Sequence, residues 1–170
     1  MLISIIILLI VVSQPSYQVI YSCDSQVACG CSTNSVSITR IVGGENAVAA
    51  TWGWIVSISV ANVYLCGGSI ISNSWVITTA HCINGYVPSQ ITIYAGSIRR
   101  FTGTEIRQIS QIIIHPNYDS STYVNDIALL RISSPLIMTD PNISLICIPS
   151  VNSSVPTASE WPTAGTTVSD

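Results

Sequence analysis

The sequence predicts an all-β protein built around one small, closed or nearly closed barrel. Apolar and polar residues alternate over residues 54–60, which is the period-2 pattern of a strand with one buried face. Turn-forming residues separate the following apolar runs, and no stretch keeps an apolar period of 3.6 residues. The other runs of strand length lie at 64–71, 75–80, 90–95, 106–115 and 127–132. Six short strands with hairpin-like spacing favour a barrel.

Length and composition indicate one extracellular domain. A chain of 170 residues is long enough for one core and short for two. Charged residues make up 8% of the sequence, against about a quarter in an average protein, while serine and β-branched residues are abundant. The net charge is -3 and the longest basic run is Arg99-Arg100. This charge pattern argues against nucleic acid or anionic lipid as a partner.

The N-terminus predicts a signal peptide. Residues 2–12 form an apolar run broken only by Ser4, about half of the roughly 20 residues that a membrane-spanning helix needs. We assign residues 1–22 to the signal peptide, with cleavage after Ser13, Ser16 or Ser22 left open; an uncleaved membrane anchor is the alternative. The protein is therefore expected to be secreted and extracellular, with no membrane association after the signal is removed.

Six cysteines in a secreted chain are expected to be paired. They are Cys23, Cys29, Cys31, Cys66, Cys82 and Cys147. A zinc site is disfavoured because only one residue separates Cys29 from Cys31 and because His81 directly precedes Cys82. Residues 17–39 are polar, serine-rich and without periodicity, which favours a short extended pro-segment, here 23–40, over a packed element.

The strongest chemical signal is His81, at the end of the run 75–80 and beside Cys82. A Cys66–Cys82 disulfide would join two neighbouring strands next to it and stabilise the fold by about 3 kcal/mol in the chain-entropy view. An imidazole acts as base and then acid only if a partner, usually a buried carboxylate, fixes its tautomer. Asp126 opens the apolar run 126–132, where an unpartnered acid would be costly to desolvate. We therefore expect a His81–Asp126 pair.

Five strings occur in an order that resembles the trypsin and chymotrypsin family of serine proteases. They are RIVGG at 40–44, CGGSII at 66–71, WVITTAHC at 75–82, HPNY at 115–118 and DIALLRI at 126–132. The resemblance covers about residues 29–150. It implies that residues 41–150 form the first six-stranded antiparallel β-barrel of the trypsin-like two-barrel fold, with the second barrel missing. Residues 151–170 would then be a truncated inter-barrel linker.

The same resemblance assigns roles. His81 becomes the general acid and base, Asp126 orients it, and the bond between Arg40 and Ile41 becomes the activation cleavage site of a zymogen. It also makes Cys147 the tether to the pro-segment, with Cys31 as the favoured partner and Cys23–Cys29 as the remaining bridge, although six cysteines allow 15 connectivities. The family's nucleophilic serine lies in a Gly-Asp-Ser-Gly-Gly string, which does not occur in these 170 residues.

No cofactor or metal is expected. Calcium-binding members of the family use carboxylates in the loop matching residues 96–108, where this chain offers Glu105 among three arginines. Asn142 and Asn152 fit the N-glycosylation pattern.

The function expected from the resemblance is that of a secreted serine endopeptidase zymogen, whose partners are protein or peptide substrates and an activating protease. The 170-residue chain alone is expected to be inactive. The alternative is a secreted protease homologue without catalysis that acts as a binding or decoy protein.

Overall fold

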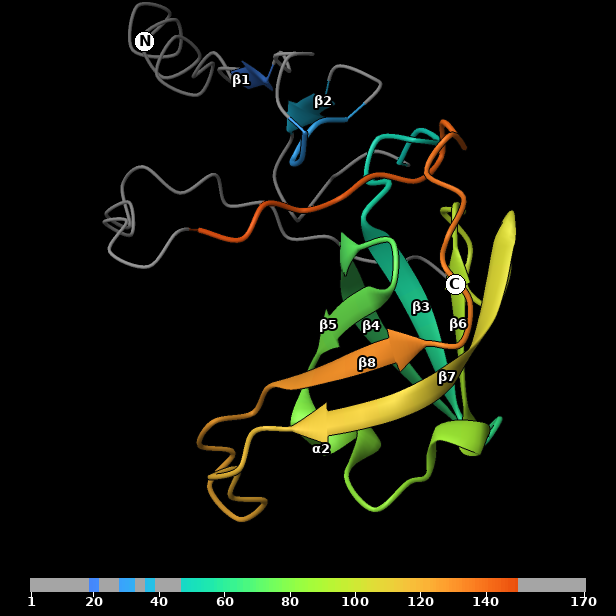
Figure 1. Ribbon diagram of the computed structural model, residues 1–170. Helices are drawn as coiled ribbons and strands as arrows, with labels where there is room; N and C mark the ends of the chain where they lie inside the picture. The colour runs from blue at the N-terminus through green and yellow to red at the C-terminus, as the bar shows by residue number, and fades with distance from the viewer. Residues whose placement is uncertain (1–18, 22–27, 33–35, 39–46, 150–170) are drawn as a thin grey trace, which may run out of the picture.

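A closed antiparallel barrel forms the body of the protein. The computed structural model describes residues 19–21, 28–32, 36–38 and 47–149 (Figure 1). The barrel strands follow the order β3-β4-β5-β8-β7-β6, and β6 pairs with β3 to close the ring. Their bounds are β3 (Ile55–Val60), β4 (Tyr64–Ser72), β5 (Trp75–Thr78), β6 (Ile91–Ala95), β7 (Glu105–Ile114) and β8 (Ala128–Ile132). The predicted all-β fold with a six-stranded barrel is confirmed.

The period-2 pattern of the sequence becomes the inside and the outside of this barrel. In β6, for example, Ile91, Ile93 and Ala95 are buried while the residues between them are partly exposed. The largest fully buried side chains come from five of the barrel strands and α2 (Ala80–Ile83): Val56, Ile58, Val60, Ile70, Val76, Ile83, Ile91, Ile93 and Leu130. Each such burial contributes about 1.5–3 kcal/mol relative to exposure, so the aliphatic interior holds the strands in register.

Four short elements differ from expectation. The run 75–80 stops being a strand after Thr78, and α2 follows as a single helical turn, too short to leave a 3.6-residue period in the sequence. A 3₁₀ turn, η1 (Pro88–Gln90), precedes β6. Residues 17–39 were expected to contain no packed element, yet β1 (Val19–Tyr21) pairs antiparallel with β2 (Val36–Ile38). Both segments consist mainly of strand-favouring residues, and β1 lies within the predicted signal peptide.

Several predicted features lie outside the described residues: Cys23, Arg40, Ile41, Asn152, the linker 151–170 and most of the segment 1–22. Within the described ranges, no helix combines the length and the apolar character needed to cross a membrane.

Two adjacent glycines in β4 provide a matched test of the barrel packing. A Cβ on Gly68 would lie 2.9 Å from Ile58 Cδ1, Val76 Cγ1 and the Ile77 carbonyl oxygen, whereas a Cβ on Gly67 would meet nothing within 4 Å. We expect Gly68→Ala to lower the free energy of unfolding by about 1–3 kcal/mol through overpacking, measured by urea denaturation. Gly67→Ala is the control and should stay within about 0.5 kcal/mol. Equal losses in the two variants would contradict this view of the core.

Candidate active site

The barrel register brings His81 and Asp126 together. Strands β5 and β8 are antiparallel, and their ladder pairs Thr78 with Ala128 at its end. Ala80 lies two residues beyond the end of β5 and Asp126 lies two residues before the start of β8. The ladder therefore places the Asp126 carboxylate at the start of α2. The two predicted site residues meet although 45 positions separate them in the sequence.

The Asp126 carboxylate satisfies the first turn of α2. Thr79 occupies the N-cap position of this helix without making a side-chain cap. Asp126 Oδ1 instead accepts the backbone N–H of His81 at 2.8 Å, and the backbone of Ala80 also hydrogen-bonds to this carboxylate. Because the first N–H groups of a helix have no intrahelical partner, Asp126 acts as a cap supplied from another strand.

The second oxygen of Asp126 fixes the imidazole. His81 Nδ1 lies 2.6 Å from Asp126 Oδ2. An ionised carboxylate can only accept hydrogen bonds, so Nδ1 carries a proton and Nε2 of the neutral ring is left as the basic atom. The hydrogen bond from the His81 side chain is the main reason why the pKa of Asp126 lies below its usual value, with burial opposing it. The His81 side chain is 48% exposed and that of Asp126 is 20% exposed, so the basic nitrogen lies at the surface and its orienting partner lies behind it.

Tyr123 is a site residue that the sequence did not reveal. Its ring meets His81 edge-on, with centroids 5.8 Å apart and an interplanar angle of 84°. Its backbone is in the left-handed region with φ 57°, a conformation that the surrounding loop imposes on a bulky residue. The only sequence signal is its place three residues before Asp126.

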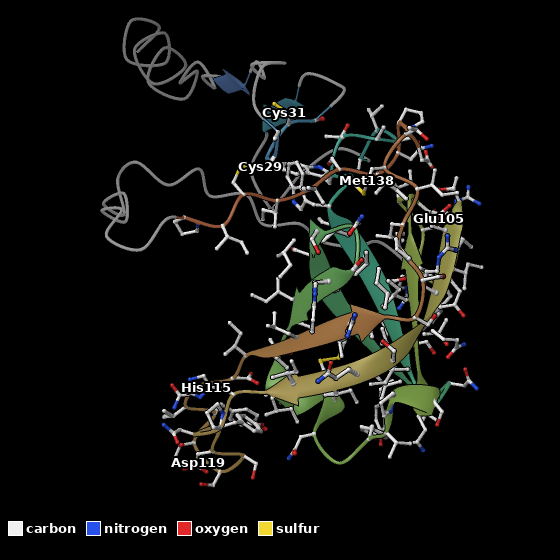
Figure 2. The ribbon with its side chains drawn as sticks, viewed as in Figure 1. Cys29, Cys31, Glu105, His115, Asp119 and Met138 are labelled. Carbon is white, nitrogen blue, oxygen red and sulfur yellow. A yellow bond between two sulfur atoms is a disulfide. The ribbon has the colours of Figure 1, made fainter. Side chains whose placement is uncertain are left out.

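Asp119 organises the loop that carries Tyr123. Its carboxylate accepts the N–H and hydroxyl of Ser121 and the hydroxyl of Thr122. These hydrogen bonds lower the pKa of Asp119 to about 2. Figure 2 shows Asp119 in the same loop region as His115, whose Nδ1 accepts the Asn117 N–H at 3.2 Å. The His115 side chain thus stabilises the turn at residues 115–117.

The Cys66–Cys82 disulfide joins β4 to α2, directly after His81, and is the pairing that the sequence favoured. The sulfur of Cys82 lies 3.5 Å from His81 Nε2 and accepts a hydrogen bond from the Thr79 hydroxyl at 3.2 Å. The His81 ring of this His81–Asp126 dyad therefore has the Asp126 carboxylate at Nδ1 and the disulfide near Nε2.

The predicted tether was assigned to the wrong cysteine. Cys147 is bonded to Cys29 and not to Cys31, which also excludes a Cys23–Cys29 bridge. Cys31 is itself disulfide-bonded. The reason is the turn at Gly30, which has φ +71° and whose N–H donates to the Leu145 carbonyl at 2.7 Å. This turn presents Cys29 to Cys147, and Figure 2 shows it at the other end of the barrel from His115 and Asp119.

The remaining candidates have structural partners. Glu105 is buried and forms an ion pair with Arg107, and within the described ranges no three His, Cys, Asp or Glu side chains gather as a metal site would require. Asn142 is half-buried, and its Nδ2 donates to Asp140 Oδ1 at 2.9 Å. Its amide therefore already has a partner in the folded chain.

Comparisons with known proteins agree with this geometry. A family model described as Trypsin matches residues 41–169. Transmembrane protease serine 11G of Mus musculus is 32% identical over 71% of this chain and 29% of its own length, and ovochymase of Halocynthia roretzi is 40% identical over 75% of this chain and 9% of its own length. Among solved structures, a scabies mite inactivated protease paralogue, S-D1, matches with a TM-score of 0.57 and 32% identity, covering 61% of this chain and 44% of that one.

A closed six-stranded barrel that presents an aspartate-held histidine defines the class as trypsin-like serine proteases. The chain belongs to the trypsin family. It spans less than a third of the length of these two curated relatives.

The structure predicts how the Asp126 cap depends on pH. Its folded pKa lies below the unfolded value of about 3.9, so its stabilising contribution is present above that value and is lost as the pH falls through the folded pKa. We expect Asp126→Asn to be less stable than the parent at pH 7, with the difference closing below about pH 4. Urea denaturation across a pH series measures this.

Asp140→Asn is the control for Asp126→Asn, because Asp140 hydrogen-bonds Asn142 and Thr104 and does not touch His81. It should leave the NMR resonances of the His81 imidazole in place, whereas Asp126→Asn should move them. A stability difference for Asp126→Asn that does not change with pH would contradict the assigned cap.

Proposed function

We propose that this chain is part of a secreted trypsin-like serine endopeptidase that acts on proteins and peptides. The observation that carries the proposal is the 2.6 Å contact between His81 Nδ1 and Asp126 Oδ2, with the ring 48% solvent-exposed. A purely structural histidine would have no need of a half-buried carboxylate that fixes its tautomer and leaves Nε2 as a base. Secretion is supported by the predicted signal peptide and by the disulfides.

In the proposed reaction, His81 Nε2 takes the proton of a serine hydroxyl as that oxygen attacks the peptide carbonyl, and then gives the proton to the leaving amine. Asp126 stabilises the imidazolium that forms between these two steps. No cofactor enters this chemistry. The 170 residues contain no Gly-Asp-Ser-Gly-Gly string, so we propose that they are inactive on their own and contribute the proton-transfer half of the site.

The proposed activation step is cleavage between Arg40 and Ile41 by another protease. The Cys29–Cys147 disulfide bridges a sequence separation of 118 residues and has one cysteine on each side of that bond. A cleaved pro-segment would therefore stay attached to the barrel.

Limited digestion with trypsin tests the activation step. We expect cleavage after Arg40 to give a new N-terminus at Ile41, with the N-terminal fragment released on a gel only after reduction. Arg40→Gln should prevent this cut. The double variant Cys29→Ser/Cys147→Ser should release the fragment without reductant, and retention of the fragment in that variant would contradict the assigned tether.

A second candidate function is binding without catalysis, as a decoy or partner. Two observations favour it: a solved relative is described as an inactivated protease paralogue, and the outer barrel face carries a cross-strand apolar row. In this row Leu129 of β8 pairs with Ile77 of β5 and with Ile113 of β7, which is 41% exposed. An exposed apolar surface is a common docking site or an aggregation liability.

Activity assays separate the two candidates. We expect the purified 170-residue chain to hydrolyse no casein and to react with no serine-directed phosphonate probe. If the messenger RNA continues into a Gly-Asp-Ser-Gly segment, the longer product should be an active protease, and His81→Ala should lower its kcat by about 10²–10⁴-fold. Probe-sensitive hydrolysis by the 170-residue chain would contradict the assignment of a half-site. A stop codon directly after Asp170 together with a soluble, partner-binding monomer would favour the binding function.

A further inference from the structure

The two sulfur atoms of the Cys66–Cys82 disulfide have different surroundings. Cys82 Sγ accepts a hydrogen bond from the Thr79 hydroxyl at 3.2 Å and lies 3.5 Å from His81 Nε2. Within the part of the chain that the structure describes, Cys66 Sγ makes no such polar contact. Negative charge on sulfur would therefore be stabilised at Cys82 and not at Cys66.

The His81–Asp126 pair strengthens this asymmetry. Asp126 holds the proton on Nδ1, so a protonated ring directs its Nε2–H toward the Cys82 sulfur. A thiolate beside an imidazolium has a lowered pKa, and a thiolate of lower pKa is the faster leaving group in disulfide exchange.

We propose that the Cys66–Cys82 disulfide is a thiol-exchange site in which Cys66 is attacked and Cys82 leaves. An incoming thiolate forms a bond to Cys66 Sγ, the bond between the two protein sulfurs breaks, and its electron pair goes to Cys82 Sγ beside His81. A second small thiolate then attacks the small-thiol sulfur of this mixed disulfide, the bond to Cys66 Sγ breaks, and its electron pair goes to Cys66 Sγ, which leaves as the thiolate and takes up a proton. The protein disulfide gains two electrons and two protons, and two small thiols become one disulfide.

The reactants are small thiols such as glutathione. Both cysteines are only partly buried, and the His81 side chain beside them is 48% exposed. The inference is independent of peptide hydrolysis, because it uses the disulfide, Thr79 and His81 and needs no serine nucleophile.

The Cys29–Cys147 disulfide is an internal control. Cys147 is exposed, so exposure alone predicts that Cys29–Cys147 opens first. We expect the opposite when the oxidised 170-residue chain is treated with glutathione, quenched with iodoacetamide at short times and mapped by mass spectrometry. Cys66–Cys82 should open before Cys29–Cys147, with glutathione on Cys66 and the alkyl group on Cys82. Earlier opening of Cys29–Cys147, or glutathione mainly on Cys82, would overturn the proposal.

Variants test whether His81 and Thr79 speed the opening of the disulfide, or whether it opens only because solvent thiols can reach it. His81→Ala and Thr79→Val should each slow the opening of Cys66–Cys82, His81→Ala by about tenfold, because each removes a contact that stabilises the leaving sulfur. His115→Asn is the control and should leave the rate unchanged, since its Oδ1 can still accept the Asn117 N–H.

Circular dichroism establishes that each variant is folded. Rates equal to the parent in folded His81→Ala and Thr79→Val would sink the proposal. If a variant does not fold, the position of glutathione in the unaltered chain decides.

Discussion

The Asp126 carboxylate is the contact on which the site depends. One of its oxygens caps the first turn of α2 and the other holds the His81 ring, so helix formation and ring orientation share one acceptor. The ladder that pairs Thr78 with Ala128 places this acceptor. Because side chains alternate along a strand, a slip of one residue would turn Asp126 away from α2. The His81–Asp126 dyad therefore forms in only one register of β5 and β8.

That register is held by the barrel interior and not by the dyad. Val76 and Leu130 are partners across the same ladder, and both are fully buried. The free energy gained by burying these aliphatic side chains fixes the register of the two strands without any contribution from the hydrogen bonds of Asp126. The surface position of the His81 ring is compatible with precise geometry for this reason: the ring is exposed, but the backbone that carries it is anchored through α2 to the core by the buried Ile83.

The fold was predictable because side chains alternate between the two faces of a strand. The apolar residues that alternate in the sequence are therefore the residues that are buried inside the barrel. The His81–Asp126 pair was predictable from residue types beside apolar runs. Other features depend on backbone conformations that residue types do not reveal. Cys29 and Cys31 are chemically equivalent in the sequence, and the left-handed turn at Gly30, anchored to Leu145, decides which one faces Cys147. Tyr123 contacts the His81 ring from another left-handed backbone position, in the loop where Asp119 accepts hydrogen bonds from Ser121 and Thr122.

The proposed thiol exchange would link the oxidation state of the Cys66–Cys82 disulfide to the ability of His81 to act as a base. Nε2 has one lone pair, so it cannot accept the proton of a serine hydroxyl while it is protonated and paired with a thiolate. In the disulfide, Cys82 has no proton and no charge, and its sulfur is only a weak acceptor, which leaves Nε2 free to act as a base. In the reduced form, the thiolate of Cys82 would stabilise the imidazolium and withdraw that base. The oxidised state of Cys66–Cys82 would thus be a condition for proton transfer at His81 as well as a link between β4 and α2.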